Sequence, residues 1–156
     1  MNPNRCLIPI AAVAATVVGG SLAIADKKTF QDPKDAKGPA DIKEVRAGHD
    51  PKGRLVHRIE MYGNIPEGRA PGVNVYAGEF DRVGSSYQVS SFGVTNGLGE
   101  KTGRVKTKTP DNKTVVYKFR KGAIDNPDSY KWQACVCIEG EQQDLAPNQK
   151  ATHKLR

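Results

Sequence analysis

Apolar and polar residues alternate in short runs along most of the chain, and no run keeps a helical period for three turns. The clearest run spans residues 54–62, where Leu55, His57, Ile59 and Met61 share one face. Alternation with a period of two is typical of a β-strand that has one face buried. We therefore expect a strand here, with His57 as a hydrogen-bonded residue of the core.

Further runs of β-branched and aromatic residues predict more strands, over residues 42–47, 73–80, 87–91, 103–109, 114–119 and 130–139. Sixteen Gly and ten Pro provide the turns between them. Short strands at this spacing favour a sandwich or a barrel. We predict an all-β domain, an antiparallel β-sandwich of about seven or eight strands.

The faces that alternation assigns to the interior predict the core. Trp132 is the only tryptophan and lies on such a face, together with Tyr130. The core residues that we expect are Leu55, Ile59, Val75, Val115, Tyr117, Phe119, Trp132, Val136 and Ile138.

The first 25 residues have a different pattern. Arg5 carries a positive charge, an apolar run extends from Cys6 to Val18, Gly19 and Gly20 interrupt it, and small residues stand at Ala23–Ala25. This order is the signature of a secretory signal peptide. We expect cleavage after Ala25, a secreted or envelope location, and no transmembrane segment after cleavage. The alternative is a membrane anchor, although the run barely reaches the roughly 20 apolar residues that a bilayer requires.

Removing residues 1–25 leaves a mature chain of 131 residues, enough for one domain. We expect residues 26–40 to lie extended along the domain, residues 41–156 to form the sandwich, and the polar tail from residue 140 to be looped. The mature chain carries 23 Lys and Arg against 17 Asp and Glu. An exported basic protein meets cell-wall glycans and other anionic polymers, whereas nucleic acid is an unexpected partner in that compartment.

The mature chain keeps two cysteines, Cys135 and Cys137, on one expected strand. Side chains two positions apart on a strand are about 6.6 Å apart, whereas a disulfide needs Cβ atoms at about 3.5–4.5 Å. Three alternatives stay open: the strand bends and a disulfide forms, both thiols are free, or each bonds another chain. Surface thiols or a local bridge fit better than a redox site, because the spacing is not that of a thioredoxin-like motif.

Basic residues alternate on two neighbouring strands, which a turn at Pro110 connects. If Lys108 pairs with Thr114, Arg104 lies opposite Lys118, and like charges in that position destabilise a sheet. An anionic ligand would remove this cost; the alternative is a solvated face relieved by nearby acids. The expected anion-binding residues are Arg104, Lys106, Lys118 and Arg120.

Three acids, Asp32, Asp35 and Asp41, lie within ten residues, and Gly38 and Pro39 bend the chain between them. Ca²⁺ takes six to eight oxygen ligands and accepts carboxylates mixed with backbone carbonyls. This loop therefore predicts a structural calcium site. The alternative is that the acids are solvated and merely offset the lysines nearby, Lys34, Lys37 and Lys43.

Several segments in order resemble small exported proteins of uncharacterised function from actinomycete-type bacteria, which are distantly similar to family 9 carbohydrate-binding modules and DOMON-like domains. The segments are residues 32–42 (DPKDAKGPADI), 54–57 (RLVH), 130–132 (YKW) and 144–148 (DLAPN). The resemblance implies a sandwich of jelly-roll type and adds Asp144 as a fourth calcium ligand. The chain departs from the pattern at Lys34, where a Gly is usual, and it lacks paired exposed tryptophans for holding sugar.

Motifs for catalysis are not found in the sequence, which has no G-x-S-x-G elbow, no histidines at metal spacing and no phosphate-cradling glycine loop followed by a helix. We therefore expect a non-catalytic exported domain that binds an envelope polysaccharide or another anionic polymer. The alternatives are a structural or assembly protein of the envelope and a hydrolase whose catalytic groups meet only in the fold.

Overall fold

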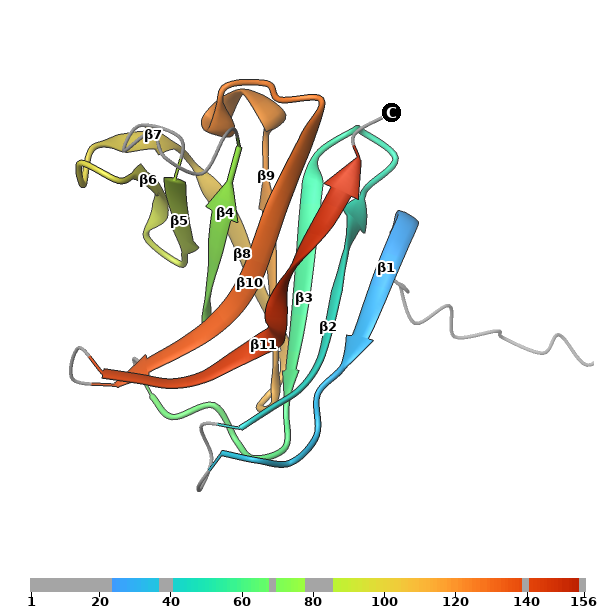
Figure 1. Cartoon of the computed structure of the whole chain (residues 1–156), viewed down its shortest axis with the longest axis vertical. Helices are drawn as coiled ribbons and strands as arrows, with labels where there is room; N and C mark the ends of the chain where they lie inside the picture. The colour runs from blue at the N-terminus through green and yellow to red at the C-terminus, as the bar shows by residue number, and fades with distance from the viewer. Residues whose placement is uncertain (1–23, 37–40, 68–69, 78–85, 139–140, 155–156) are drawn as a thin grey trace, which may run out of the picture.

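The computed structural model of the chain describes residues 24–36, 41–67, 70–77, 86–138 and 141–154 (Figure 1). The signal peptide predicted over residues 1–25 therefore lies almost wholly outside the described residues. The described part is all-β, with two antiparallel sheets and a short 3₁₀ helix, η3 (Lys121–Ile124). The predicted fold class is thus confirmed at the level of an antiparallel, sandwich-like all-β fold, and jelly-roll winding stays a prediction.

One sheet has five strands and the other has six. In spatial order, the five-stranded sheet contains β1 (Ala25–Gln31), β2 (Ile42–His49), β3 (Leu55–Met61), β9 (Thr114–Phe119) and β8 (Val105–Asp111). The six-stranded sheet contains β11 (Glu141–Lys154), β10 (Ser129–Ile138), β4 (Gly72–Tyr76), β5 (Ser86–Ser90), β6 (Gly93–Asn96) and β7 (Lys101–Gly103).

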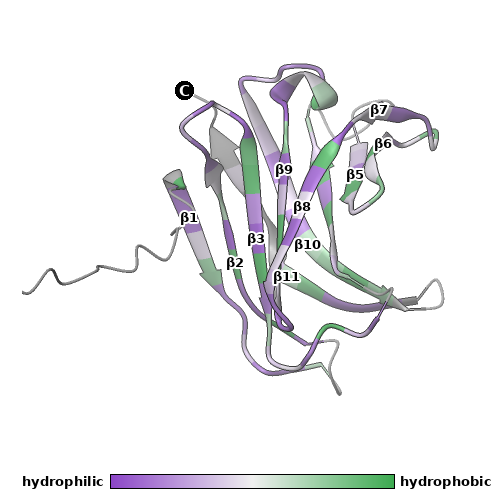
Figure 2. Cartoon of the chain, turned by 180° about the vertical axis from the view of Figure 1, so that it is seen from behind, coloured by the Kyte–Doolittle hydropathy of each residue, from purple (hydrophilic) through white to green (hydrophobic). Residues whose placement is uncertain are grey.

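The core lies between the sheets and is built from the predicted faces. Along β3, buried and partly exposed positions alternate from residue 57 to 61. Figure 2 shows hydrophobic and hydrophilic bands along the same strand. His57 is fully buried with Nε2 2.9 Å from the Tyr130 hydroxyl, as expected of a core histidine. The side chain of Ile138 is outside the described residues. The other predicted core residues are all buried: Leu55, Ile59, Val75, Val115, Tyr117, Phe119, Trp132 and Val136.

The two polar ends of the chain both pair into the sheets as strands. Residues Ala25–Gln31 form β1, an edge strand that pairs with β2, and Phe30 packs edge-on against Trp132 at 5.5 Å between ring centroids. The tail is the long strand β11, which pairs with β10 through two irregularities. The prediction of a looped tail is wrong over residues 141–154, because backbone hydrogen bonds to β10 hold a sequence with few apolar side chains.

The described part contains eleven strands, more than the seven or eight predicted. The additional strands are edge strands or short ones, namely β1, β6, β7 and β11. Such strands bury few side chains and therefore leave little alternation in the sequence. Within the described residues, no helix has the length and apolar character needed to cross a bilayer.

Candidate metal centre

Four aspartates meet where the last strand of one sheet passes the first strands of the other (Figure 1). Asp32 and Asp35 follow β1, Asp41 immediately precedes β2, and Asp144 is on β11. One carboxylate oxygen from each lies within 4.8 Å of those of the others. The structure thus brings together the four residues that the sequence and the resemblance suggested for calcium.

Backbone amides fix the carboxylate of Asp144. The amide of Ile42 donates to its Oδ2 at 2.6 Å, and the amide of Leu145 donates to its Oδ1 at 2.8 Å. The bond from Ile42 joins β2 to β11 across the two sheets. Asp144 therefore holds the tail against the start of the domain even before any ion is considered.

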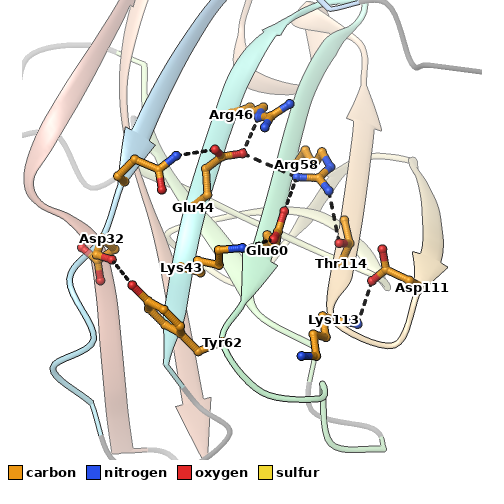
Figure 3. A network of polar contacts seen from close by, with 11 residues as sticks. Asp32, Lys43, Glu44, Arg46, Arg58, Glu60, Tyr62, Asp111, Lys113 and Thr114 are labelled. Atoms are coloured by element: carbon orange, nitrogen blue, oxygen red, sulfur yellow. Dashed lines mark hydrogen bonds and ion pairs between the residues drawn. The ribbon is translucent and has the colours of Figure 1, made fainter.

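Tyr62 anchors the other side of the cluster. Its amide donates to the Asp41 carbonyl at 2.9 Å, and its hydroxyl donates to the Asp32 carbonyl at 2.9 Å (Figure 3). The Asp32 amide in turn donates to the carbonyl of Lys43 at 2.9 Å. These bonds use backbone atoms, so the carboxylates of Asp32 and Asp41 stay available for a ligand.

The carboxylate of Asp41 is the decisive feature of the cluster. Asp41 is 0% exposed, and neither of its side-chain oxygens has a hydrogen-bond partner among the described residues. Asp32 is 6% exposed, and its Oδ2 also lacks a partner there. A buried ionised carboxylate without a counter-charge or hydrogen bonds costs several kcal/mol. A bound cation would remove that cost.

The close approach of the four aspartates affects the pKa values of their carboxyl groups. Burial, as the largest cause, and the negative charges of Asp144, Asp35 and Asp41 together raise the pKa of Asp32 from 3.8 to about 6. Burial also raises the pKa of Asp144, although its two backbone hydrogen bonds act in the opposite direction. The four carboxylates thus repel one another in the metal-free protein.

The alternative explanation for the aspartates is that they offset the charges of nearby lysines, but the described lysines interact with other groups. The ammonium of Lys43 pairs with Glu60 at 2.7 Å, within a network of ion pairs on the outer face of the five-stranded sheet (Figure 3). The Lys34 ammonium lies 6.0 Å from the centroid of the Tyr62 ring. Lys37 is outside the described residues. Neither described lysine therefore neutralises the aspartate cluster.

The donor set fits calcium. Four carboxylates supply hard oxygens and no softer ligand, which suits Ca²⁺ rather than Zn²⁺. At Ca–O distances of 2.3–2.6 Å, oxygens on opposite sides of the ion are roughly 4.6–5.2 Å apart, which accommodates the observed separations. Mg²⁺ binds at 2.0–2.1 Å and demands near-ideal octahedral geometry. An ion held here would tie together the opening segment, β2 and β11.

The raised pKa of Asp32 predicts an unusual pH dependence for the metal-stripped protein. Its folded pKa of about 6 exceeds the ordinary 3.8, so the folded state takes up the proton first as pH falls. The free energy of unfolding should therefore rise by about 1–3 kcal/mol between pH 6.5 and pH 4.5. Urea unfolding after dialysis against chelator measures it. In the Asp32→Asn variant this rise should be smaller, and equal slopes in both proteins would contradict the assignment.

The predicted basic patch has a different register from the expected one. Asp111, not Lys108, pairs with Thr114, and Lys106 rather than Arg104 lies opposite Lys118. The difference arises because the turn is tighter than expected, with Asp111 opposite Thr114, while an irregularity between Lys108 and Asp111 adds one residue to β8; together they shift the register at Lys118 by two residues. The pairing expected from the sequence is therefore wrong.

The structure also separates the four residues of the patch. Lys106 is exposed on β8, and the Lys118 ammonium lies 3.6 Å from a carboxylate oxygen of the buried Asp50. Asp50, which also pairs with Arg54, thus lies close enough to reduce the repulsion between the two lysines. Arg104 and Arg120, by contrast, line one cavity of about 490 Å³.

Both cysteines are free thiols in the structure. Cys137 is exposed, but Cys135 is buried, so the expectation of two surface thiols is wrong for Cys135. Burial raises the pKa of the Cys135 thiol, and the neighbouring Cys137 adds to the effect. A buried, protonated thiol such as that of Cys135 is a poor nucleophile.

Sequence reasoning did not single out a polar groove on the outer face of the six-stranded sheet. Asn74 lies opposite Gln88, Gln88 lies opposite Thr95, and Tyr76 is two positions from Asn74 on the same face. These residues line a cavity of about 490 Å³ together with Asn96 and the glycines of the following turn. The sequence carries one signal for these residues: Asn74, Tyr76 and Gln88 stand at the outward-facing positions of the alternating strands β4 and β5.

Comparisons with known proteins leave the family open. No protein-family model matches the chain, and neither a curated protein nor a solved structure matches it. The function therefore has to be argued from the sites themselves.

Proposed function

We propose that this protein is an exported, non-catalytic binding domain for a cell-envelope polysaccharide, with a structural calcium at the aspartate cluster. In this proposal the leader is cleaved after Ala25 and the mature domain acts in the envelope or outside the cell. Jelly-roll winding, as the resemblance implies, is part of the same proposal. The observation that carries it is the groove on the six-stranded sheet.

The groove has the chemistry of a sugar site. Amides of Asn74 and Gln88 and the hydroxyl of Thr95 offer donors and acceptors in one row, which suits the hydroxyl groups of a sugar. Tyr76 adds an aromatic surface against which the apolar face of a sugar ring can pack. The described residues that line the groove include no carboxylate, imidazole or thiol, so they support binding rather than acid–base chemistry.

The rigidity of the sheet supports the same function. Val73, Val75 and Val89 anchor β4 and β5 in the core, so the alternate residues of the groove project from a fixed backbone. Side chains held in place before binding lose less freedom when a ligand arrives. Calcium would act at a distance, by closing β11 against β2 at the other edge of the sandwich.

Loss of the groove amides tests the proposal. Asn74→Ala combined with Gln88→Ala should weaken binding to a neutral envelope polysaccharide by about tenfold, since each direct hydrogen bond contributes about 0.5–1.5 kcal/mol. Titration calorimetry of the mature protein against neutral galactan, mannan and glucan measures it.

The matched control is Gln143→Ala, which removes an exposed amide from β11 outside the groove. It should leave affinity unchanged. Binding by the parent to none of these polymers would refute neutral-glycan recognition, and equal affinity in the double variant would exclude the groove as the site.

A further inference from the structure

Two arginines lie where the chain leaves the end strands of the five-stranded sheet, Arg104 before β8 and Arg120 after β9. Arg104 connects β7 to β8, and Arg120 connects β9 to η3. Val105 pairs with Phe119, so one further step along the two strands places Arg104 opposite Arg120. Both side chains line the same cavity of about 490 Å³, together with Thr102, Gly103, Gly122 and Ala123.

The walls of this arginine cleft, formed by the six residues just named, are held in a defined arrangement. The Thr102 hydroxyl donates to the Ala123 carbonyl at 2.8 Å, and the Ala123 amide donates to the Arg120 carbonyl at 2.9 Å. A Cβ added to Gly103 would lie 2.4 Å from the Cβ of Ala123, so glycine is required for η3 to pack this closely on β7. The backbone walls of the cleft, between Thr102, Gly103 and Ala123, are therefore set before any ligand binds.

The two arginines of the cleft differ from the nearby Lys118, which lies close to a carboxylate. Two positions further along these strands, Lys106 lies opposite Lys118, whose ammonium is 3.6 Å from a carboxylate oxygen of Asp50. Among the described residues, no carboxylate forms a salt bridge with Arg104 or Arg120. Two like charges opposite each other at a strand end are unfavourable, and an anion between them would make the arrangement favourable.

We infer that the arginine cleft binds an oxyanion group, a carboxylate, sulfate or phosphate, carried by an acidic polymer of the cell envelope. The planar guanidinium presents paired N–H donors that match two oxygens of such a group, which a lysine cannot do. Thr102 and Gly103 line the cavity beside the arginines. This inference deepens the proposed function, on which it rests for the compartment and the polymeric ligand, but it concerns a site separate from the groove.

Binding of acidic polymers by charge-matched variants tests the inference. The probes are polygalacturonate, dextran sulfate and polyphosphate at about 0.15 M salt, so that the three arms identify which oxyanion is preferred. Arg104→Gln combined with Arg120→Gln should weaken binding of the preferred polymer by at least about tenfold. Arg104→Lys combined with Arg120→Lys keeps the charge but loses the paired donors, and it should lose most of that affinity as well.

The control is Lys106→Gln combined with Lys108→Gln, which removes the same charge from exposed positions on β8. It should weaken binding by less than about threefold, through diffuse attraction only. Three results would overturn the inference. They are an equal loss of affinity in the glutamine variants of the arginine pair and of the lysine pair, full affinity in the arginine-to-lysine variant, and no binding of any probe by the parent protein. The neutral glycans that report on the groove would still bind in each case, so the two proposals fail separately.

Discussion

Calcium is expected to raise the thermal unfolding midpoint of the mature protein by roughly 10 °C when it is present at about one hundred times its dissociation constant. An ion that binds only the folded state adds about 2.7 kcal/mol of stability at that ratio, and a domain of this size gains a few degrees per kcal/mol. The physical reason is the cluster of four carboxylates, above all the fully buried Asp41, whose charge has no partner among the described residues. Calorimetric scans in millimolar calcium and in chelator measure the difference.

Asp41→Asn should abolish most of this response. In chelator the variant should be at least as stable as the parent, because it replaces a buried charge by a neutral amide of the same shape. Asp128→Asn is the control, since Asp128 is exposed and outside the cluster, and it should respond to calcium like the parent. Identical midpoints in calcium and chelator for the parent would refute the metal centre, and an undiminished response of Asp41→Asn would move it elsewhere.

Trp132→Ala is expected to lower the free energy of unfolding by about 3–5 kcal/mol, the usual cost of deleting a large buried aromatic side chain. The ring is 0% exposed and contacts Phe30 of β1 and His57 of β3 edge-on, at 5.5 and 5.1 Å between centroids. Its loss leaves a cavity between the two sheets and loosens β1. Urea unfolding, followed by far-ultraviolet circular dichroism, measures the change.

Trp132→Phe separates packing from hydrogen bonding at the same position. The indole Nε1 is buried without a hydrogen-bond partner among the described residues, so phenylalanine removes an unsatisfied donor while keeping much of the ring. This variant should cost less than half as much as Trp132→Ala. A cost below about 1 kcal/mol for Trp132→Ala would contradict the burial of the ring.

Alternation alone located most of the central strands, because a half-buried strand must place apolar residues at every second position. The strands β3, β9 and β10 and their core residues were predictable for this reason, and so was the burial of Trp132. The edge strands β1 and β11 were not, because their residues are held mainly by backbone hydrogen bonds to one neighbour. Phe30 is a single apolar residue in a polar run and carries no periodic signal.

The sequence also predicted only part of each candidate site. Three of the aspartates are close in sequence, so the loop suggested a cation, but only the pairing of β10 with β11 brings Asp144 to it, about one hundred residues along the chain. Likewise, the sequence shows basic residues on two adjacent strands, yet an irregularity in β8 decides that Lys106 lies opposite Lys118 while Arg104 and Arg120 share a cleft. The sequence by itself determines the residue types and their short-range spacing. The register of the strands and the approach of distant strands depend on backbone pairing and core packing, which only the tertiary structure shows.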